Sequence, residues 1–328
     1  MTTAPPAIRC QGVSFGFGSE ALFQNLTLDV PEGSFFAIVG RSGSGKTTFL
    51  RLVAGVLAPQ TGVIQVCGQD PKEARSRKMI SVCPQSPALL PWLTVRGNVE
   101  SAFRMWGQPV DGAAVRWAIE TVGLSNAAAK RPAELSGGMK ARTALARAWV
   151  TPGARVLLMD ESFSSVDEIT RVELARVLTR LWQEQRKTVL FVTHVIAEAI
   201  SLATHIWPLA EGERSGAVQP IVISDAHRRI QEARGRTVFH QAILSILGGG
   251  TLGEGIIDRE LVQELRKSFS PAELGSVVAL IRDDRFPRTL RLNLVQLLEP
   301  FENDGKIDGK IRDAMRAAID TIWDSGTP

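Results

Sequence analysis

Long apolar segments are absent from this sequence of 328 residues. A helix that spans a bilayer needs about 20 consecutive apolar residues, and no run here comes close to that length. Residues Met1 to Pro6 also lack the basic and apolar segments that together make a secretion signal. We therefore expect a protein that neither crosses a membrane nor is secreted.

Cysteine is scarce. The chain has three cysteines, and their spacing matches no metal-binding pattern: Cys10, Cys67 and Cys83. A small, odd number of cysteines is typical of proteins in a reducing cytosol. Net charge is also low, because 38 Lys and Arg oppose 34 Asp and Glu. The basic residues form no run and do not alternate with aromatic residues, so we expect no nucleic-acid partner.

One glycine-rich stretch dominates what is present. An apolar run at Phe35–Val39 predicts a buried strand, and a helical pattern begins at Lys46. The turn between them follows the pattern G-x-x-x-x-G-K-T, whose glycines let backbone N–H groups surround phosphate oxygens. A glycine-rich turn without a ligand is the alternative, but the Lys-Thr pair favours a nucleotide. The candidate nucleotide-binding residues are Gly40, Ser42, Gly43, Ser44, Gly45, Lys46, Thr47 and Thr48.

Two acidic residues follow a second apolar strand. Val156 to Met159 leads into Asp160 and Glu161. Asp160 can hold Mg²⁺ together with the Thr47 hydroxyl, and Glu161 can polarise the water that attacks the γ-phosphate. A helix N-cap is the alternative explanation for such a pair of acids.

A second candidate anion site opens the helix that starts near Gly138. Ser136, Gly137 and Gly138 place a hydroxyl and backbone N–H groups at a helix N-terminus, about 90 residues after the phosphate loop. Without other motifs, a capped helix would explain this segment equally well.

The rest of the first two thirds alternates strands with helices, which predicts a mostly parallel sheet covered by helices. Strands are expected at Ile8–Phe15 and Leu26–Val30, separated by a flexible loop that contains Phe15-Gly16-Phe17-Gly18. Helices are expected at about 95–105, 113–122, 138–150 and 169–185. Three prolines between Pro84 and Pro91 exclude a continuous helix there.

The sequence changes character near Gly212–Gly216. Strand patterns become rare beyond this point, and helical patterns prevail. We expect one domain over residues 1–215 with a helical part at about 86–150, a linker at 216–235 and a helical accessory domain at 236–328.

In this order, the motifs resemble those of the ATP-binding subunits of ABC transporters over about residues 7–212. Gly40 to Thr48 is similar to the Walker A loop, and Ser136 to Met139 is similar to the signature motif. Asp160 and Glu161 resemble the Walker B aspartate and the catalytic glutamate. The resemblance implies an α/β P-loop NTPase fold. This fold has a mostly parallel core sheet, an antiparallel N-terminal β part and a helical signature subdomain, followed here by the helical C-terminal domain.

The resemblance also assigns roles outside these motifs. Gln85 is similar to the Q-loop glutamine, which contacts Mg²⁺ and the attacked phosphate, and His194 resembles the switch histidine. Ser164-Ser165-Val166-Asp167 looks like the D-loop, and Asp167 would lie at the nucleotide. Phe17, by its spacing, resembles the aromatic residue that stacks on adenine. The implied cofactors are ATP and Mg²⁺, with Thr47, Gln85 and Asp160 at the metal.

Such subunits act as head-to-tail dimers, so the family implies that a second copy of this chain supplies Ser136, Gly137 and Gly138 to each ATP. It also implies permease subunits that contact the stretch from Gln85 to Val95, and an indirect partner, a periplasmic or extracellular solute-binding protein. The expected location is the cytoplasmic face of the inner membrane, where the protein binds peripherally. The segment from Leu89 to Val95 is similar to the nitrate, sulfonate and taurine importers, which take up small anionic solutes.

The sequence departs from the family pattern at five positions: Met139, Ala141, Ser162, Ser165 and Val195. None of these departures removes a contact to phosphate, magnesium or water, so we expect them to affect the turnover rate and not the reaction itself. Two alternatives to an importer subunit stay open, a soluble ABC ATPase and a cassette for lipid transport or export, each with a regulatory C-terminal domain. For that domain, a simple packing or dimerisation role is as compatible with the sequence as regulation.

Overall fold

The computed structural model describes residues 5–18, 20–163, 166–209, 220–222 and 313. The chain divides into two compact units, 1–219 and 220–328. In the second unit the described residues are strand β9 (Ile221–Val222) and the helical residue 313. The predicted accessory domain at 236–328 lies outside the described residues apart from residue 313, and the predicted linker apart from 220–222. Both therefore stay predictions.

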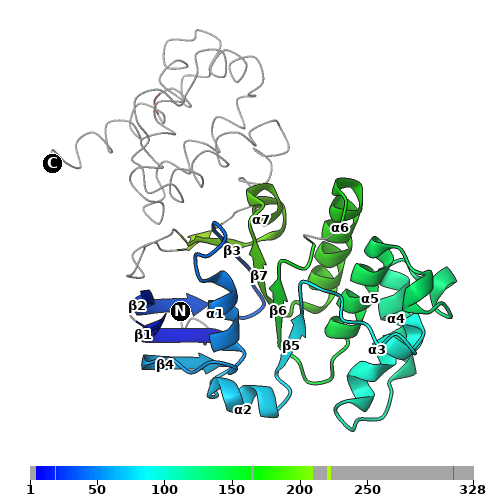
Figure 1. Ribbon diagram of the computed structural model, residues 1–328, viewed down its shortest axis with the longest axis horizontal. Helices are drawn as coiled ribbons and strands as arrows, with labels where there is room; N and C mark the ends of the chain where they lie inside the picture. The colour runs from blue at the N-terminus through cyan, green and yellow to red at the C-terminus, as the bar shows by residue number, and fades with distance from the viewer. Residues whose placement is uncertain (1–4, 19, 164–165, 210–219, 223–312, 314–328) are drawn as a thin grey trace. The chain divides into compact units, whose positions relative to one another are not determined.

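A small antiparallel sheet, with strand order β2-β1-β4, forms one side of the first unit (Figure 1). Its strands are β1 (Ile8–Phe17), β2 (Glu20–Val30) and β4 (Thr61–Val66). The expected flexible loop at Phe15–Gly18 is wrong, because the first strand continues through Phe17. Phe15 pairs with Phe23, and Phe17 pairs with Glu20. Alternating apolar residues on both strands keep the hairpin paired almost to its tip.

The central sheet is parallel, and within the first unit its order is β5-β6-β7-β3-β8. Its strands are β3 (Phe35–Val39), β5 (Ile80–Cys83), β6 (Val156–Asp160), β7 (Thr188–Thr193) and β8 (His205–Pro208). Every residue of β3 and β7 is buried, as expected for a parallel sheet covered on both faces. Val39 pairs with Thr193, and Asp160 pairs with Val192. The carboxyl ends of these strands therefore meet at one edge.

Helices cover this sheet and extend beyond it. They are α1 (Lys46–Val53), α2 (Pro71–Ser76), α3 (Val95–Arg104), α4 (Gly112–Thr121), α5 (Gly137–Trp149), α6 (Glu168–Gln185) and α7 (Ile196–Leu202), with short 3₁₀ turns η1 (Ser125–Ala127) and η2 (Pro132–Glu134). Neither α7 nor β8 was expected from the sequence. Both are short, and seven residues of helical pattern are easily taken for a loop.

Helix α1 lies between the two sheets and so fixes the loop that precedes it. Phe49 is fully buried, with its ring 6.0 Å from Phe23 of β2 and 5.2 Å from Trp207 of β8. Burying a side chain of this size stabilises the fold by about 1.5–3 kcal/mol. These aromatic contacts hold the start of α1 against both sheets.

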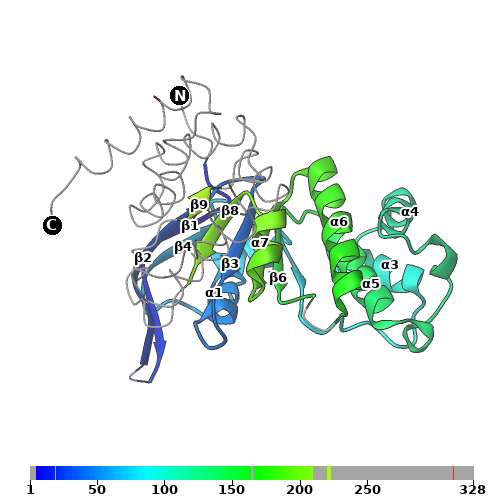
Figure 2. The same cartoon turned by 90° about the horizontal axis from the view of Figure 1, so that it is seen from above.

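Helices α3, α4 and α5 pack on one another at the far side of β5 and β6 from α1 (Figures 1 and 2). No described helix combines the length and the apolar character that a membrane span needs.

Candidate functional site

The phosphate loop runs from the buried end of β3 into α1. Gly45 precedes the helix with φ +96°, and Gly43 has φ +89°, a left-handed conformation that glycine adopts without strain. A Cβ on Gly40 would lie 2.5 Å from the carbonyl oxygen of Leu209, so only glycine fits there. These glycines let the loop fold back over the start of α1. The first N–H groups of that helix have no intrahelical partner and face outward along its axis.

Lys46 lies inside this loop with 5% of its surface exposed. Its ammonium donates to the carbonyl oxygens of Gly40, at 2.9 Å, and Arg41, at 2.8 Å. It also lies 4.0 Å from a carboxylate oxygen of Glu161. Burial lowers the pKa of Lys46, and the nearby carboxylates of Glu161 and Asp160 oppose that shift. The loop thus holds a buried positive charge beside two acids.

Thr47 and Asp160 meet across two elements, as the sequence predicted. The Thr47 hydroxyl donates to Oδ1 of Asp160 at 3.0 Å. Burial raises the pKa of Asp160, while the hydrogen bond from Thr47 lowers it. A hydroxyl and a carboxylate placed together are the oxygen ligands that Mg²⁺ prefers when phosphates complete its coordination.

Glu161 stands directly after β6 in an unusual backbone conformation. Its φ is +43°, which costs a residue other than glycine about 1–2 kcal/mol. Its N–H donates to the carbonyl oxygen of Val192 at 3.0 Å, which holds this turn against β7. The turn brings Oε2 of Glu161 to 3.3 Å from Nδ1 of His194, which follows β7. The paired acids are therefore no helix N-cap.

Gln85, Phe17 and the phosphate loop come from different strands. Gln85 is exposed and follows β5, whose end pairs with β6 beside Asp160. Phe17 is 54% exposed, with its ring 5.1 Å from that of Phe15. The same hairpin carries Phe23, whose ring would be 3.1 Å from a Cβ on Gly45. The structure thus places Phe17 on the hairpin that supports the phosphate loop.

Ser136, Gly137 and Gly138 lie elsewhere. The Ser136 hydroxyl caps α5 by accepting from the N–H of Met139 at 3.3 Å. Figures 1 and 2 draw α1 and α5 on opposite sides of β6. The side chain of Asp167 caps α6, accepting from the N–H and the hydroxyl of Thr170. Thr170 in turn lies against Gly138, where a Cβ would meet its methyl group at 2.4 Å. Within a single chain, the candidate anion site at residues 136–138 therefore contacts the Asp167 segment, and it does not contact Lys46.

The residues of the phosphate loop fit a bound nucleotide. The Ser44 hydroxyl is buried in the loop and has no hydrogen-bond partner among the described residues. Space is open beside Gly43, where a Cβ would meet nothing within 4 Å. Among the described residues, no cluster of three or more His, Cys, Asp or Glu could hold a metal ion alone. The hydroxyl of Thr47 and the carboxylate of Asp160, 3.0 Å apart, are oxygen ligands that fit a metal sharing its coordination with phosphates.

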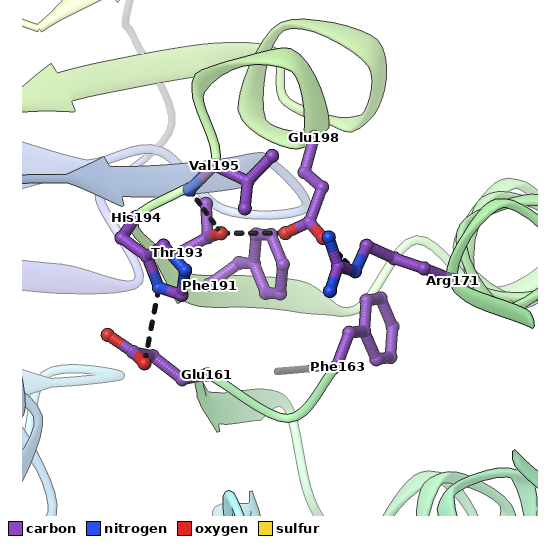
Figure 3. Close-up of a pocket in the computed structure, with 8 residues that line it drawn as sticks. All are labelled: Glu161, Phe163, Arg171, Phe191, Thr193, His194, Val195 and Glu198. Carbon is purple, nitrogen blue, oxygen red and sulfur yellow. Dashed lines mark hydrogen bonds and ion pairs between the residues drawn. The ribbon is translucent and has the colours of Figure 1, made fainter. Parts of the chain in front are cut away.

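Sequence reasoning missed the polar residues that support this site. Three polar residues next to His194 line a small pocket together with Glu161 (Figure 3): Arg171, Thr193 and Glu198. Asn98, fully buried, binds the backbone of Leu90, Leu93 and Thr94 through its side-chain amide. A lone Glu or Asn in a helical pattern carries no signal of such contacts.

The ABC transporter family profile matches residues 23–164 of this chain. The aliphatic sulfonates import ATP-binding protein SsuB 1 of Burkholderia lata is 38% identical over 244 residues, which cover 74% of this chain and 73% of that protein. The aliphatic sulfonates import ATP-binding protein SsuB of Rhodopseudomonas palustris is 40% identical over 211 residues, 64% of this chain and 73% of that protein.

Two solved structures are similar in fold. One is a dimeric post-hydrolysis state of an ATP-binding cassette bound to ADP and Pi. It has a TM-score of 0.56 and 26% identity, and the match covers 66% of this chain and 99% of that one. The other is cbiO1 from Clostridium perfringens, part of the ABC transporter complex cbiONQ. Its TM-score is 0.59 at 20% identity, over 73% of this chain and 99% of that one, a likeness that supports the fold alone. The predicted α/β P-loop cassette fold is confirmed.

Proposed function

The chain belongs to the ATP-binding subunits of ABC transporters and is an ATPase; from this premise we propose that it drives an importer for small anionic solutes. It would work as a head-to-tail dimer on a membrane permease. The observation that carries this proposal is the meeting of Lys46, Thr47, Asp160, Glu161 and His194 at one edge of the parallel sheet.

Each of these residues has a role that its position supports. The buried ammonium of Lys46 offsets charge on the terminal phosphates, since it lies in the loop that would surround them. Glu161 holds the attacking water and accepts its proton, and His194, 3.3 Å away, keeps that carboxylate in place. Gln85 would contact both metal and phosphate from the end of β5. Mg²⁺, held by Thr47 and Asp160, would neutralise charge on the phosphate oxygens.

The other half of the site would come from a second copy of the chain. Ser136 and Gly137 are exposed at the N-terminus of α5 and Gly138 is buried just behind them, and the N–H groups of such a helix end can bind an anion. In a head-to-tail dimer, this end of α5 would close over the phosphates held by the partner's loop, with Asp167 beside it. Hydrolysis would remove the charge that holds the two copies together.

The permease would bind the loop between Gln85 and Val95. Trp92 in this loop is 67% exposed, and large exposed aromatic residues are enriched at protein interfaces. The loop is shaped from inside by Asn98 and from α5 by Arg147, whose guanidinium donates to the carbonyl oxygens of Pro87 and Ala88. Arg147 thus links the permease contact to the helix that begins at Gly137. The protein would bind peripherally at the cytoplasmic face of the membrane.

The names of the relatives support the solute class. Both SsuB relatives are named as ATP-binding proteins for the import of aliphatic sulfonates, so a small anion of the nitrate, sulfonate or taurine type is the proposed cargo. The solute would reach the permease through a separate solute-binding protein. Residues 236–328 are proposed as an accessory domain that regulates transport, and deletion of residues 224–328 should then alter the response of transport to its substrate.

Purification from solubilised membranes tests the proposed function. We expect the full chain to co-purify with an integral membrane permease and the complex to hydrolyse ATP in the presence of Mg²⁺. Trp92→Ala should release the chain from the permease while leaving ATP binding intact. Recovery with ribosomes, or with no membrane protein, would contradict the importer role.

A further inference from the structure

A polar cluster lies beside His194, in the small pocket that Glu161 also lines (Figure 3). Its members are Arg171 of α6, Thr193 at the end of β7 and Glu198 of α7, named here the Glu198 cluster. Glu198 is the centre, with 10% of its side chain exposed. One of its oxygens accepts from the Thr193 hydroxyl at 2.6 Å, and the other lies 3.3 Å from Nε of Arg171.

On one side, this cluster fixes the backbone around His194. The Thr193 hydroxyl donates to Glu198 and accepts from the N–H of Val195 at 3.0 Å. These two contacts hold the residues before and after His194 and so restrict the backbone from which its half-exposed ring extends. That ring reaches Glu161 at 3.3 Å. Loss of the hydrogen bond between Thr193 and Glu198 would let this backbone shift and the imidazole turn away from the Glu161 carboxylate.

On its other side, the cluster reaches the start of α6. The Arg171 guanidinium donates to the carbonyl oxygen of Val166 at 3.4 Å, directly before Asp167. Asp167 caps the same helix through Thr170, and Thr170 touches Gly138 of α5. A movement of this helix end would therefore also displace Arg171, which contacts Glu198.

The simpler explanation is an ion pair that attaches α6 to α7, and for that purpose Arg171 and Glu198 alone would be enough. Here the carboxylate divides its two oxygens between Arg171 and Thr193. It is thus a single group that bridges the Asp167 segment and the His194 segment. This division of contacts favours a role in positioning over simple attachment of two helices.

We propose that Glu198 and Arg171 are positioning residues that hold His194 on Glu161 and make this alignment respond to the segment at Asp167. The inference rests on the proposed function, which places Asp167 against a second copy of the chain. Arrival of that copy would move the start of α6, and the Glu198 cluster would pass the movement to His194. Hydrolysis would then be fastest only when the dimer is closed.

Steady-state ATP hydrolysis by the full-length chain with Mg²⁺ tests this proposal. Glu198→Gln should lower kcat about tenfold and change KM for ATP less than about twofold, because Lys46 and Phe17 lie on other elements. Thr193→Val should do the same while it leaves the Arg171–Glu198 pair intact. Because it keeps the charge pair, this variant decides the matter if Glu198→Gln fails to fold.

Three comparisons separate positioning from stability. The control is Glu173→Gln, which removes another ion pair of α6, with Arg142 at 3.4 Å, and should keep the wild-type kcat. Arg171→Lys should recover part of the activity that Arg171→Met loses. The double variant Glu198→Gln with Arg171→Met should be no slower than the slower single variant, since both act through one contact.

The proposal is overturned if Glu198→Gln and Thr193→Val keep the kcat of Glu173→Gln. It is equally overturned if the losses in kcat multiply in the double variant and follow the melting temperature. Failure of the proposed function would look different, because the wild-type chain would then stay a single copy when ATP is bound, or would co-purify with no membrane permease.

Discussion

Two helix N-termini of this chain are proposed anion sites of the same physical kind, yet their surroundings differ. The start of α1 is preceded by a glycine loop and lies among Lys46, Asp160 and Glu161, with the lysine 5% exposed. The start of α5 is preceded by Ser136, which is exposed, and Gly137 has open space around it. The first site has a buried ammonium, two carboxylates and a hydroxyl, the groups that the proposal assigns to phosphate, metal and water, whereas the second offers N–H groups and a hydroxyl.

This difference indicates how the work is divided. Groups that act on a phosphate bond need burial and fixed geometry, and the residues proposed for this role lie together in one chain around β3, β6 and β7. A surface that must release and rebind once in each cycle has to stay exposed. The exposed end of α5 is thus suited to a nucleotide held by another copy.

The largest effect is expected at Glu161. Glu161→Gln keeps the size of the side chain but cannot accept a proton, so hydrolysis should fall by at least about 100-fold. ATP binding should persist, because the loop and Lys46 are unchanged, and the ATP-bound chain should accumulate as a dimer. Release of inorganic phosphate measures the hydrolysis, and size-exclusion chromatography with ATP measures the dimer. A variant that hydrolyses ATP at the wild-type rate would refute the role given to Glu161.

A somewhat smaller effect is expected at Lys46. Lys46→Met keeps the apolar stem but removes the ammonium that faces the phosphates, and we expect ATP to bind about 10–100-fold more weakly. Titration with a fluorescent ATP analogue measures this. Arg51→Met, on the same helix but outside the phosphate loop, is the matched control and should bind as the wild type does. If Lys46→Met binds ATP as tightly as the wild type, the proposed role of Lys46 in holding the phosphates is wrong.

At the second anion site, the effect should depend on the partner copy. A Cβ on Gly137 would meet nothing within 4 Å, so Gly137→Ala should fold with an almost unchanged melting temperature. Its hydrolysis should nevertheless fall about tenfold, equal to ~1.4 kcal/mol, because the methyl group would separate the two copies. ATP binding to the single chain should stay the same. If hydrolysis also stays the same, the end of α5 has no part in the reaction.

The smallest effect on activity is expected at Lys187, which precedes β7 at the sheet edge opposite both anion sites. Its ammonium donates to the carbonyl oxygen of Trp149 at 2.6 Å, and burial lowers its pKa from 10.5 to about 8. Between these values the unfolded chain binds a proton that the folded chain has lost. The contribution of Lys187 to the free energy of unfolding therefore increases as the pH rises from about 8 to 10.5.

Urea unfolding from pH 8 to 10.5 measures this contribution as the difference between wild type and Lys187→Met. The difference should change by up to about 3 kcal/mol in favour of the wild type, while hydrolysis per folded molecule stays equal. Parallel stability curves would show that Lys187 keeps its ordinary pKa.

How much the sequence could predict differs between these regions. The phosphate loop and the acids after β6 were predictable, because glycines at fixed positions and a strand that ends in acids each have a local physical cause. That Glu161 reaches His194 could not be predicted, because it depends on a left-handed turn at a residue other than glycine. The polar supports, Asn98 and Glu198, were missed since their partners are set by packing.

The central claim is that the phosphate loop is half of a site whose other half belongs to a second copy. Mixing two inactive variants, Lys46→Met and Gly137→Arg, tests it most directly. In a head-to-tail dimer, the mixed pair keeps one intact loop facing one intact α5 end. We expect an equal mixture to regain roughly a quarter of the wild-type hydrolysis, because half of the dimers are mixed and each has one working site. Hydrolysis no greater than that of either variant alone would contradict it.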